Sequence, residues 1–216
     1  IKARSNPKLR TILNNKNQYP DAMIQSLYRN EELIDFVYSY PSKKGHVYTS
    51  TIGPITKGRY PLLLQYDQRW GYGRYGNNVI GMNGCGPTSA AMIIAGLTGK
   101  NNITPYDVAS YAYNHGYYQD GTSWSFFTEG MKHYGIHGRN IPLSYSSMKN
   151  EIMNGRPLIC SMKPGDFTTT GHLIVIKGMK QGMFMVNDPN SIKRSNRLWS
   201  YDTLSKQIRN IWSFSR

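Results

Sequence analysis

The chain has 216 residues, of which 39% are hydrophobic and 12% aromatic, so it can bury a full-sized core and does not belong to the disordered class. Its 26 Lys and Arg residues outnumber 12 Asp and Glu residues, and the resulting net charge of +14 favours anionic partners. No apolar run approaches the roughly 18 residues of a membrane span, and two cysteines are too few for a disulfide scaffold.

The first 60 residues are predicted to form a helical extension and a connector, separate from a main domain over residues 61–216. Short amphipathic helices are expected at 7–13, 22–28 and 31–40. Pro41 should end the third helix. The connector that follows is rich in glycine, proline, lysine and threonine, and one short strand is expected in it at 47–52. Helices this short bury little area among themselves, so we expect them to pack on the main domain or on a partner.

A cysteine between two glycines opens the first helix of the main domain. Cys85 follows Gly84 and precedes Gly86 and Pro87, and the residues after them recur with helical, apolar spacing. Proline is tolerated at the first helical position, so the pattern predicts a thiol in the first turn of a buried helix. Because the positive end of a helix dipole favours an anion, we expect this thiol to ionise more readily than that of a free cysteine.

The pattern changes from helical to strand-like near Pro157. Further helices are predicted over 104–116, 123–135 and 147–154. Strands are predicted over 158–162, 173–178, 183–187 and 211–214, with one more helix at 202–209. Helices first and strands later indicate an α+β fold, in which the cysteine-bearing helix packs on an antiparallel sheet.

Two polar residues at strand ends can complete a site around Cys85. His172 opens one strand and Asp188 follows the next. In neighbouring antiparallel strands the start of one lies beside the end of the other, so the Asp188 carboxylate can reach one imidazole nitrogen while the other faces the thiol. Taken singly, a histidine at a strand start and an Asp-Pro turn are more often structural. Together they predict a Cys-His-Asp triad, with a thiolate nucleophile, an imidazole base and an orienting carboxylate.

Gln65 is the candidate for stabilising the oxyanion of such a reaction. It lies at the end of a short apolar run, ahead of Cys85 in the chain. Its side-chain amide N–H can act together with the backbone N–H of Cys85. A single glutamine is more often a surface residue, so this assignment depends on the whole pattern.

These residues carry a resemblance to a known family. Gln65, the box Gly84-Cys85-Gly86-Pro87-Thr88-Ser89, the pair Gly171-His172 and the turn Asn187-Asp188-Pro189 resemble, in this order, the C39-like cysteine peptidases of the papain-like superfamily. The resemblance covers about residues 61–216 and not the extension. It implies a papain-like fold with Cys85 as nucleophile, His172 as base, Asp188 as orienting acid and Gln65 as oxyanion residue.

The best-known relatives in that family are peptidase domains fused to ABC transporters, which cut bacteriocin leaders after a double glycine. This chain has no Walker A sequence, so the resemblance favours the stand-alone, often exported bacterial members. We therefore expect a secreted or cell-surface protein, although the chain shows no export signal.

The resulting hypothesis is a cysteine peptidase that hydrolyses amide bonds through a thioester acyl-enzyme. Its expected substrate is a peptide, and cell-wall peptide cross-links are the sharper expectation because the net charge of +14 also suits an anionic cell-surface polymer. The alternatives are a catalytically silent papain-fold binding module with a covered cleft, a cationic polyanion-binding protein, and an acyl transferase. No RRM, KH, zinc-finger or basic-zipper pattern is present, so nucleic acid is not the expected partner, and the oligomeric state stays open.

The other cysteine and the remaining histidines predict no second site. Cys160 lies inside an apolar strand and is expected to be a buried small hydrophobe rather than a disulfide partner. The other histidines share no spacing with cysteines or carboxylates that would build a zinc site, so we predict neither a metal nor a cofactor.

Overall fold

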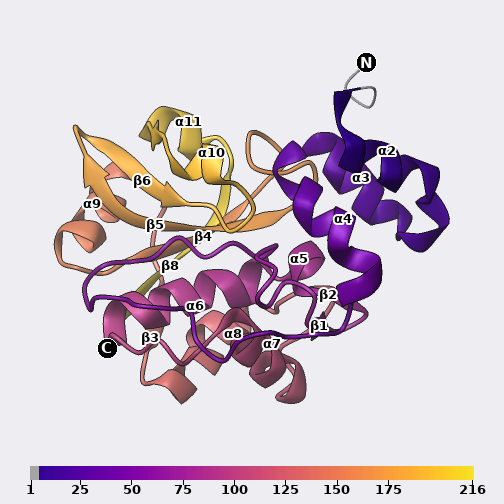
Figure 1. Cartoon of the computed structure of the whole chain (residues 1–216). Coiled ribbons are helices and arrows are strands. Elements are labelled where there is room, and N and C mark those ends of the chain that lie inside the picture. Colours follow the sequence, from indigo (N-terminus) through magenta and orange to yellow (C-terminus); the bar gives the residue numbers. More distant parts are fainter. Residues whose placement is uncertain (1–4) are drawn as a thin grey trace.

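A computed structural model describes residues 5–216 and shows a helical extension, a helical layer and an antiparallel sheet (Figure 1). Within the extension, helices alternate with 3-10 turns: α2 (Pro7–Asn14), η1 (Lys16–Gln18), α3 (Asp21–Arg29), η2 (Glu31–Leu33) and α4 (Ile34–Lys43). The side chains of Asn6 and Asn30 accept backbone N–H groups at the starts of α2 and η2. Such caps satisfy donors that a helix start leaves unpaired.

Two sequence expectations for this part of the chain are wrong. Pro41 lies inside the last turn of α4 rather than after it, because the missing N–H costs one hydrogen bond there and Lys44 N–H still bonds to the Tyr40 carbonyl. Residues 47–52 form no strand. The N–H groups of Tyr48 and Ile52 instead bond to single carbonyls of separate loops.

A small hairpin and the helical layer follow the connector. The hairpin strands are β1 (Arg74–Tyr75) and β2 (Asn78–Val79). The layer contains α5 (Ile80–Asn83), α6 (Cys85–Thr98), α7 (Pro105–Asn114), α8 (Ser125–Thr128) and the 3-10 turn η3 (Gly130–Tyr134). Helix α6 is buried along most of its length and ends at Gly99, whose φ of 74° is left-handed and suits glycine.

The antiparallel sheet has the strand order β3-β8-β4-β5-β6-β7. Its strands are β3 (His137–Asn140), β4 (Leu158–Met162), β5 (His172–Lys180), β6 (Met183–Asn187), β7 (Leu198–Trp199) and β8 (Ile208–Ser215). The connections contain α9 (Tyr145–Met153), α10 (Ile192–Ser195) and α11 (Tyr201–Ser205). This combination of helices with an antiparallel sheet confirms the predicted α+β class and agrees with a papain-like fold.

Side chains that alternate along the sheet divide the core in two. Ile159 packs with residues of α6, α7 and α8, whereas the next residue, Cys160, belongs to a cluster with residues of α9 and α11. Figure 1 accordingly shows α6 on one side of the sheet and α11 on the other. Because Cys85 packs against the first cluster, the two cysteines lie on opposite sides of the sheet, and both are free.

The extension shares a core with the beginning of the main domain. That core combines Ile12, Met23, Leu27, Leu33, Phe36 and Val37 with Tyr66, Tyr72 and Val79. Phe36 stacks on Tyr72 with ring centroids 4.5 Å apart. Gly81 leaves room for the Phe36 ring, since a Cβ at that position would lie 2.3 Å from it. The apolar faces of the extension are thus buried against the rest of the chain.

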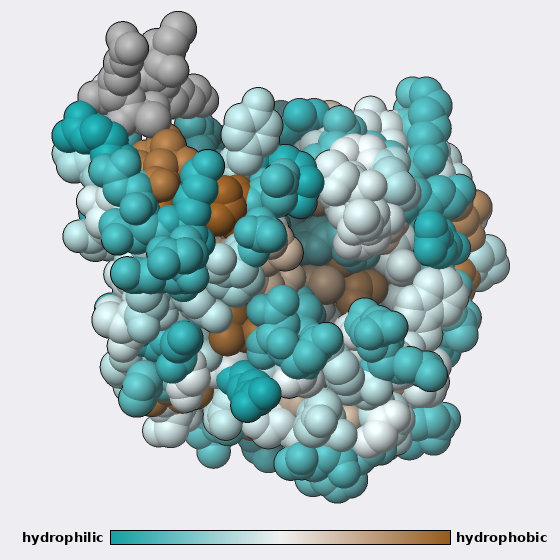
Figure 2. Space-filling model, turned by 90° about the vertical axis from the view of Figure 1, so that its right-hand side faces the viewer, coloured by the Kyte–Doolittle hydropathy of each residue, from teal (hydrophilic) through white to brown (hydrophobic). Residues whose placement is uncertain are grey.

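The outer surface on the side of the extension is mainly hydrophilic. Figure 2 shows it with hydrophobic residues singly or in small groups, and with a hollow near its centre. Among residues 5–216, no helix has both the length and the apolar character needed to cross a bilayer.

Candidate active site

Cys85 is the first residue of α6 and is partly exposed in a cavity of about 440 Å³. Gln65 and His172 line the same cavity, together with residues of the extension. The backbone N–H groups in the first turn of a helix have no partner inside the helix, and the helix dipole is positive there. The thiol therefore lies where negative charge is stabilised.

The sheet brings His172 and Asp188 together. Val175 pairs with Asn187 in the ladder of β5 and β6, so the start of β5 lies beside the residue that follows β6. Nε2 of His172 is 2.7 Å from Oδ1 of Asp188. Cys85 lines the same cavity as His172, and it contributes to the shifted pKa of the imidazole. The imidazole thus bonds to a buried carboxylate and lies in the same cavity as the thiol.

Both members of the histidine–aspartate pair have shifted pKa values. Burial alone lowers the pKa of an imidazole, but the Asp188 carboxylate and Cys85 outweigh it and raise the pKa of His172 to about 10. Burial alone would raise the pKa of Asp188, but His172 and the Arg194 guanidinium outweigh it and lower that pKa. The pair is therefore an imidazolium and a carboxylate at neutral pH.

Arg194 binds the second carboxylate oxygen of Asp188. Its Nε donates to Oδ2 at 2.6 Å, and the backbone N–H of Asn190 donates to Oδ1 at 2.8 Å. Asp188 is fully buried, so these donors replace the water that its charge would otherwise need. Arg194 is a residue of the site that the sequence pattern did not predict. The available signal was a cation six residues after a candidate carboxylate.

Gln65 lies in the wall of the cavity with 4% of its surface exposed. Its backbone N–H donates to the Pro189 carbonyl at 2.7 Å, which ties it to the turn after Asp188. Its Nε2 donates to the Gly81 carbonyl at 3.1 Å and keeps a second N–H for another acceptor. If the side-chain amide of Gln65 were flipped, its oxygen would face the Gly81 carbonyl oxygen, so this contact fixes the orientation of the amide. Gln65 and Cys85 line the same cavity, and the oxyanion role of Gln65 stays a prediction.

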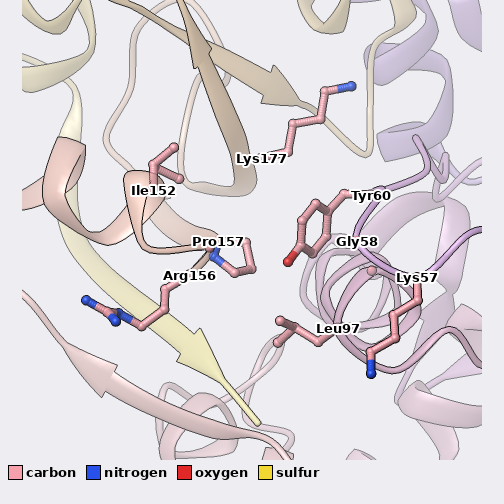
Figure 3. Close-up of a pocket in the computed structure, with 10 residues that line it drawn as sticks. Lys57, Gly58, Tyr60, Leu97, Ile152, Arg156, Pro157 and Lys177 are labelled. Atoms are coloured by element: carbon pink, nitrogen blue, oxygen red, sulfur yellow. The ribbon is translucent and has the colours of Figure 1, made fainter.

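A second cavity, of about 300 Å³, lies away from these residues. It is lined by Lys57, Tyr60, Arg156 and Lys177 among others, and the charged ends of Arg156 and Lys177 point away from each other (Figure 3). None of its lining residues carries a thiol, an imidazole or a carboxylate. Within residues 5–216, no group of three or more His, Cys, Asp or Glu residues is arranged to hold a metal ion.

Comparison with known proteins identifies the family. Residues 58–215 match the model of the Peptidase C39 like family. The chain belongs to this family. Helices α2, α3 and α4 precede the part that matches.

Among solved structures, the C39-like chain is similar to the peptidase domain of Streptococcus ComA, a bifunctional ABC transporter involved in a quorum sensing pathway. The two are 20% identical, the TM-score is 0.48, and the match covers 72% of this chain and 96% of that one. Comparison with curated proteins gives no significant match.

The charged pair should make the stability of this C39-like protein depend on pH. Because the folded-state pKa of His172 is raised, its contribution is fully present below the unfolded value of about 6.5 and is lost as the pH rises through about 10. In this window the free energy of unfolding should fall by up to about 1.4 kcal/mol per pH unit, relative to the variant His172→Gln. Asp188 has the opposite sign, since its lowered pKa adds stability that is lost as the pH falls through the folded value.

Urea unfolding of the wild type and of His172→Gln at about pH 6, 8 and 10 measures this effect. Parallel stability curves for the two proteins would show that His172 is not charged in the folded state.

Proposed function

We propose that this protein is a cysteine peptidase that hydrolyses amide bonds through a thioester acyl-enzyme. The observation that carries the proposal is the imidazole of His172, which bonds to the buried Asp188 carboxylate and lines the same cavity as Cys85 at the start of α6. Membership of a peptidase family supports the same class of reaction. Cys85, His172, Asp188 and Gln65 are the proposed catalytic residues.

In the first half-reaction, the Cys85 thiolate attacks the carbonyl carbon of the scissile amide. The electron pair of the C=O double bond moves to oxygen, which accepts hydrogen bonds from the Cys85 backbone N–H and from Gln65. The imidazolium of His172 gives its proton to the leaving nitrogen, and the C–N bond breaks. The amine product leaves, and the acyl group remains on sulfur as a thioester.

In the second half-reaction, a water molecule replaces the amine. Neutral His172 takes a proton from the water as its oxygen adds to the thioester carbon. Collapse of this intermediate expels the thiolate and releases the carboxylic acid, and the imidazolium is regenerated. Asp188 fixes the ring tautomer and stabilises the imidazolium in both half-reactions.

The extension leaves the proposed nucleophile accessible. Ser26 and Arg29 of α3 line the cavity, but about 440 Å³ remains empty and Cys85 is partly exposed. This arrangement favours an open, working cleft over a binding module whose cleft is covered.

The proposed substrates are peptides, with cell-wall peptide cross-links as the specific case. The net charge of +14 attracts anionic polymers of a cell surface, and polar residues, among them Thr168, Thr169 and Thr170, line the cavity. A wall substrate requires a protein outside the cytoplasmic membrane, so a secreted or cell-surface location is part of this proposal.

One experiment tests both the peptidase reaction and the cell-wall substrate. The protein is incubated with a peptide library and, separately, with purified wall sacculi, and new amine termini are labelled. Amine release from both substrates is the expected result. Cleavage of the library with intact sacculi would reject the wall substrate alone. No cleavage of either, with no acyl adduct on Cys85 in the protein mass spectrum, would reject the peptidase. Conjugates formed when amine acceptors are added would instead identify acyl transfer.

A further inference from the structure

Residues 188–195, here called the Asp188 loop, fix the position of the proposed orienting carboxylate. The backbone N–H of Asp188 donates to Ser195 Oγ at 2.8 Å. Asn190 and Arg194 each donate to one carboxylate oxygen. A shift of this loop therefore moves the carboxylate relative to the imidazole.

The extension holds the Asp188 loop through Glu32. Its carboxylate accepts hydrogen bonds from the Ser191 hydroxyl at 2.5 Å and from the backbone N–H groups of Ile192 at 2.8 Å and Lys193 at 3.3 Å. These contacts join positions 159 to 161 apart in the sequence. Hydrogen bonds to an ionised carboxylate are roughly twice as strong as neutral ones, so Glu32 is a strong acceptor for all three donors.

Asn30 makes a second contact with the Asp188 loop and also holds the backbone of Glu32 in place. Its Nδ2 donates to the Asn190 carbonyl at 2.8 Å, and its Oδ1 accepts the backbone N–H of Glu32 at 3.1 Å. The next residue, Leu33, is buried in the core that the extension shares with the main domain. Both contacts are therefore anchored in packed structure rather than on a free loop.

We propose that Asn30 and Glu32, the extension clamp, are positioning residues that hold Asp188 in line with His172. The extension then helps to position the proposed catalytic residues and does not merely cover the cleft. This inference rests on the proposed peptidase function. Neither residue touches the reacting atoms. Both act through the Asp188 loop.

The variant Glu32→Gln in the full chain tests the clamp, because it keeps the size of the side chain but removes its charge and replaces one of the two acceptor oxygens with an N–H₂ group. We expect kcat to fall by roughly 10- to 100-fold with little change in KM, since a displacement of about 1 Å in an active site can cost about 10²-fold. The pKa of His172, followed by NMR of the imidazole nitrogens, should also fall because Asp188 then stabilises the imidazolium less well.

Asp35→Asn is the matched control. Its carboxylate is 64% exposed on the same extension and pairs with Lys8, away from the Asp188 loop. It should leave kcat and the imidazole titration unchanged. If Glu32→Gln does not fold, Asn30→Ser keeps an N-cap oxygen but shortens the reach to Asn190, and should lower the same two quantities.

The two proposals fail in different ways. An active wild type, with wild-type kcat and imidazole titration in Glu32→Gln, would overturn the clamp and leave the peptidase standing. An inactive wild type, with a lowered imidazole pKa in Glu32→Gln, would support the clamp and count against the peptidase.

Discussion

Replacing Cys85 with alanine is expected to abolish amide hydrolysis and leave the fold intact. The fall in kcat should be on the order of 10⁴-fold or more, because only substrate binding and the oxyanion donors remain to promote the reaction. The side chain is partly exposed in the cavity, so its removal leaves no void in the core. Steady-state kinetics with a peptide taken from the library measure the first expectation, and circular dichroism with thermal unfolding measures the second.

Cys160→Ala is the matched control for this variant. It removes the other thiol, which is fully buried on the opposite side of the sheet and whose pKa is raised by that burial. The variant should keep the wild-type kcat. Iodoacetamide at neutral pH should label the wild type and Cys160→Ala but not Cys85→Ala. Wild-type turnover by Cys85→Ala would reject Cys85 as the nucleophile.

Replacing Phe36 with alanine should give the largest loss of stability among these variants. The side chain is 2% exposed and fills the space between the Tyr72 ring and Gly81, where the extension meets the main domain. Truncating a buried phenylalanine costs about 3–5 kcal/mol, and a domain has only about 5–15 kcal/mol to lose. The midpoint of urea unfolding measures the effect.

Tyr28→Ala is the control for Phe36→Ala, because it removes an aromatic ring of the same extension that is 90% exposed. Its effect should stay within about 0.5 kcal/mol. Equal midpoints for the two variants would mean that the extension does not depend on the core around Phe36.

The candidate site could be predicted where chemistry coincides with local structure. Cys85 starts a helix, His172 starts a strand and Asp188 follows one, and each position can be inferred from the residues around it. The role of Glu32 could not be inferred, because its contact with Ser191 exists only after distant segments have packed. The role of Arg194 could not be inferred either, because its contact with Asp188 depends on how the chain turns over the six positions that separate them. In the sequence, Glu32 belongs to an acidic pair at a helix start and Arg194 belongs to a basic cluster, and both look like solvated charges.

The fold, like the site, could be predicted only in part from the sequence. The buried α6 and the apolar strands β4, β5 and β6 follow from composition, but β3 does not, because His137–Asn140 has no apolar alternation and is a strand only through pairing with β8. The helix predicted over 123–135 is broken into α8 and η3. The break falls beside Gly130, whose backbone packs against the ring of Phe126.

The position of β8 has a consequence for synthesis. This strand pairs with both β3 and β4, although it follows all other strands of the sheet in the described chain. On the ribosome, β4 can pair with β5 while its other edge is still open, and all five of its residues are buried in the finished fold. A nascent chain therefore exposes an apolar strand edge until Ile208–Ser215 has been made, and chaperones that bind such edges should bind the chain before this last strand closes the sheet.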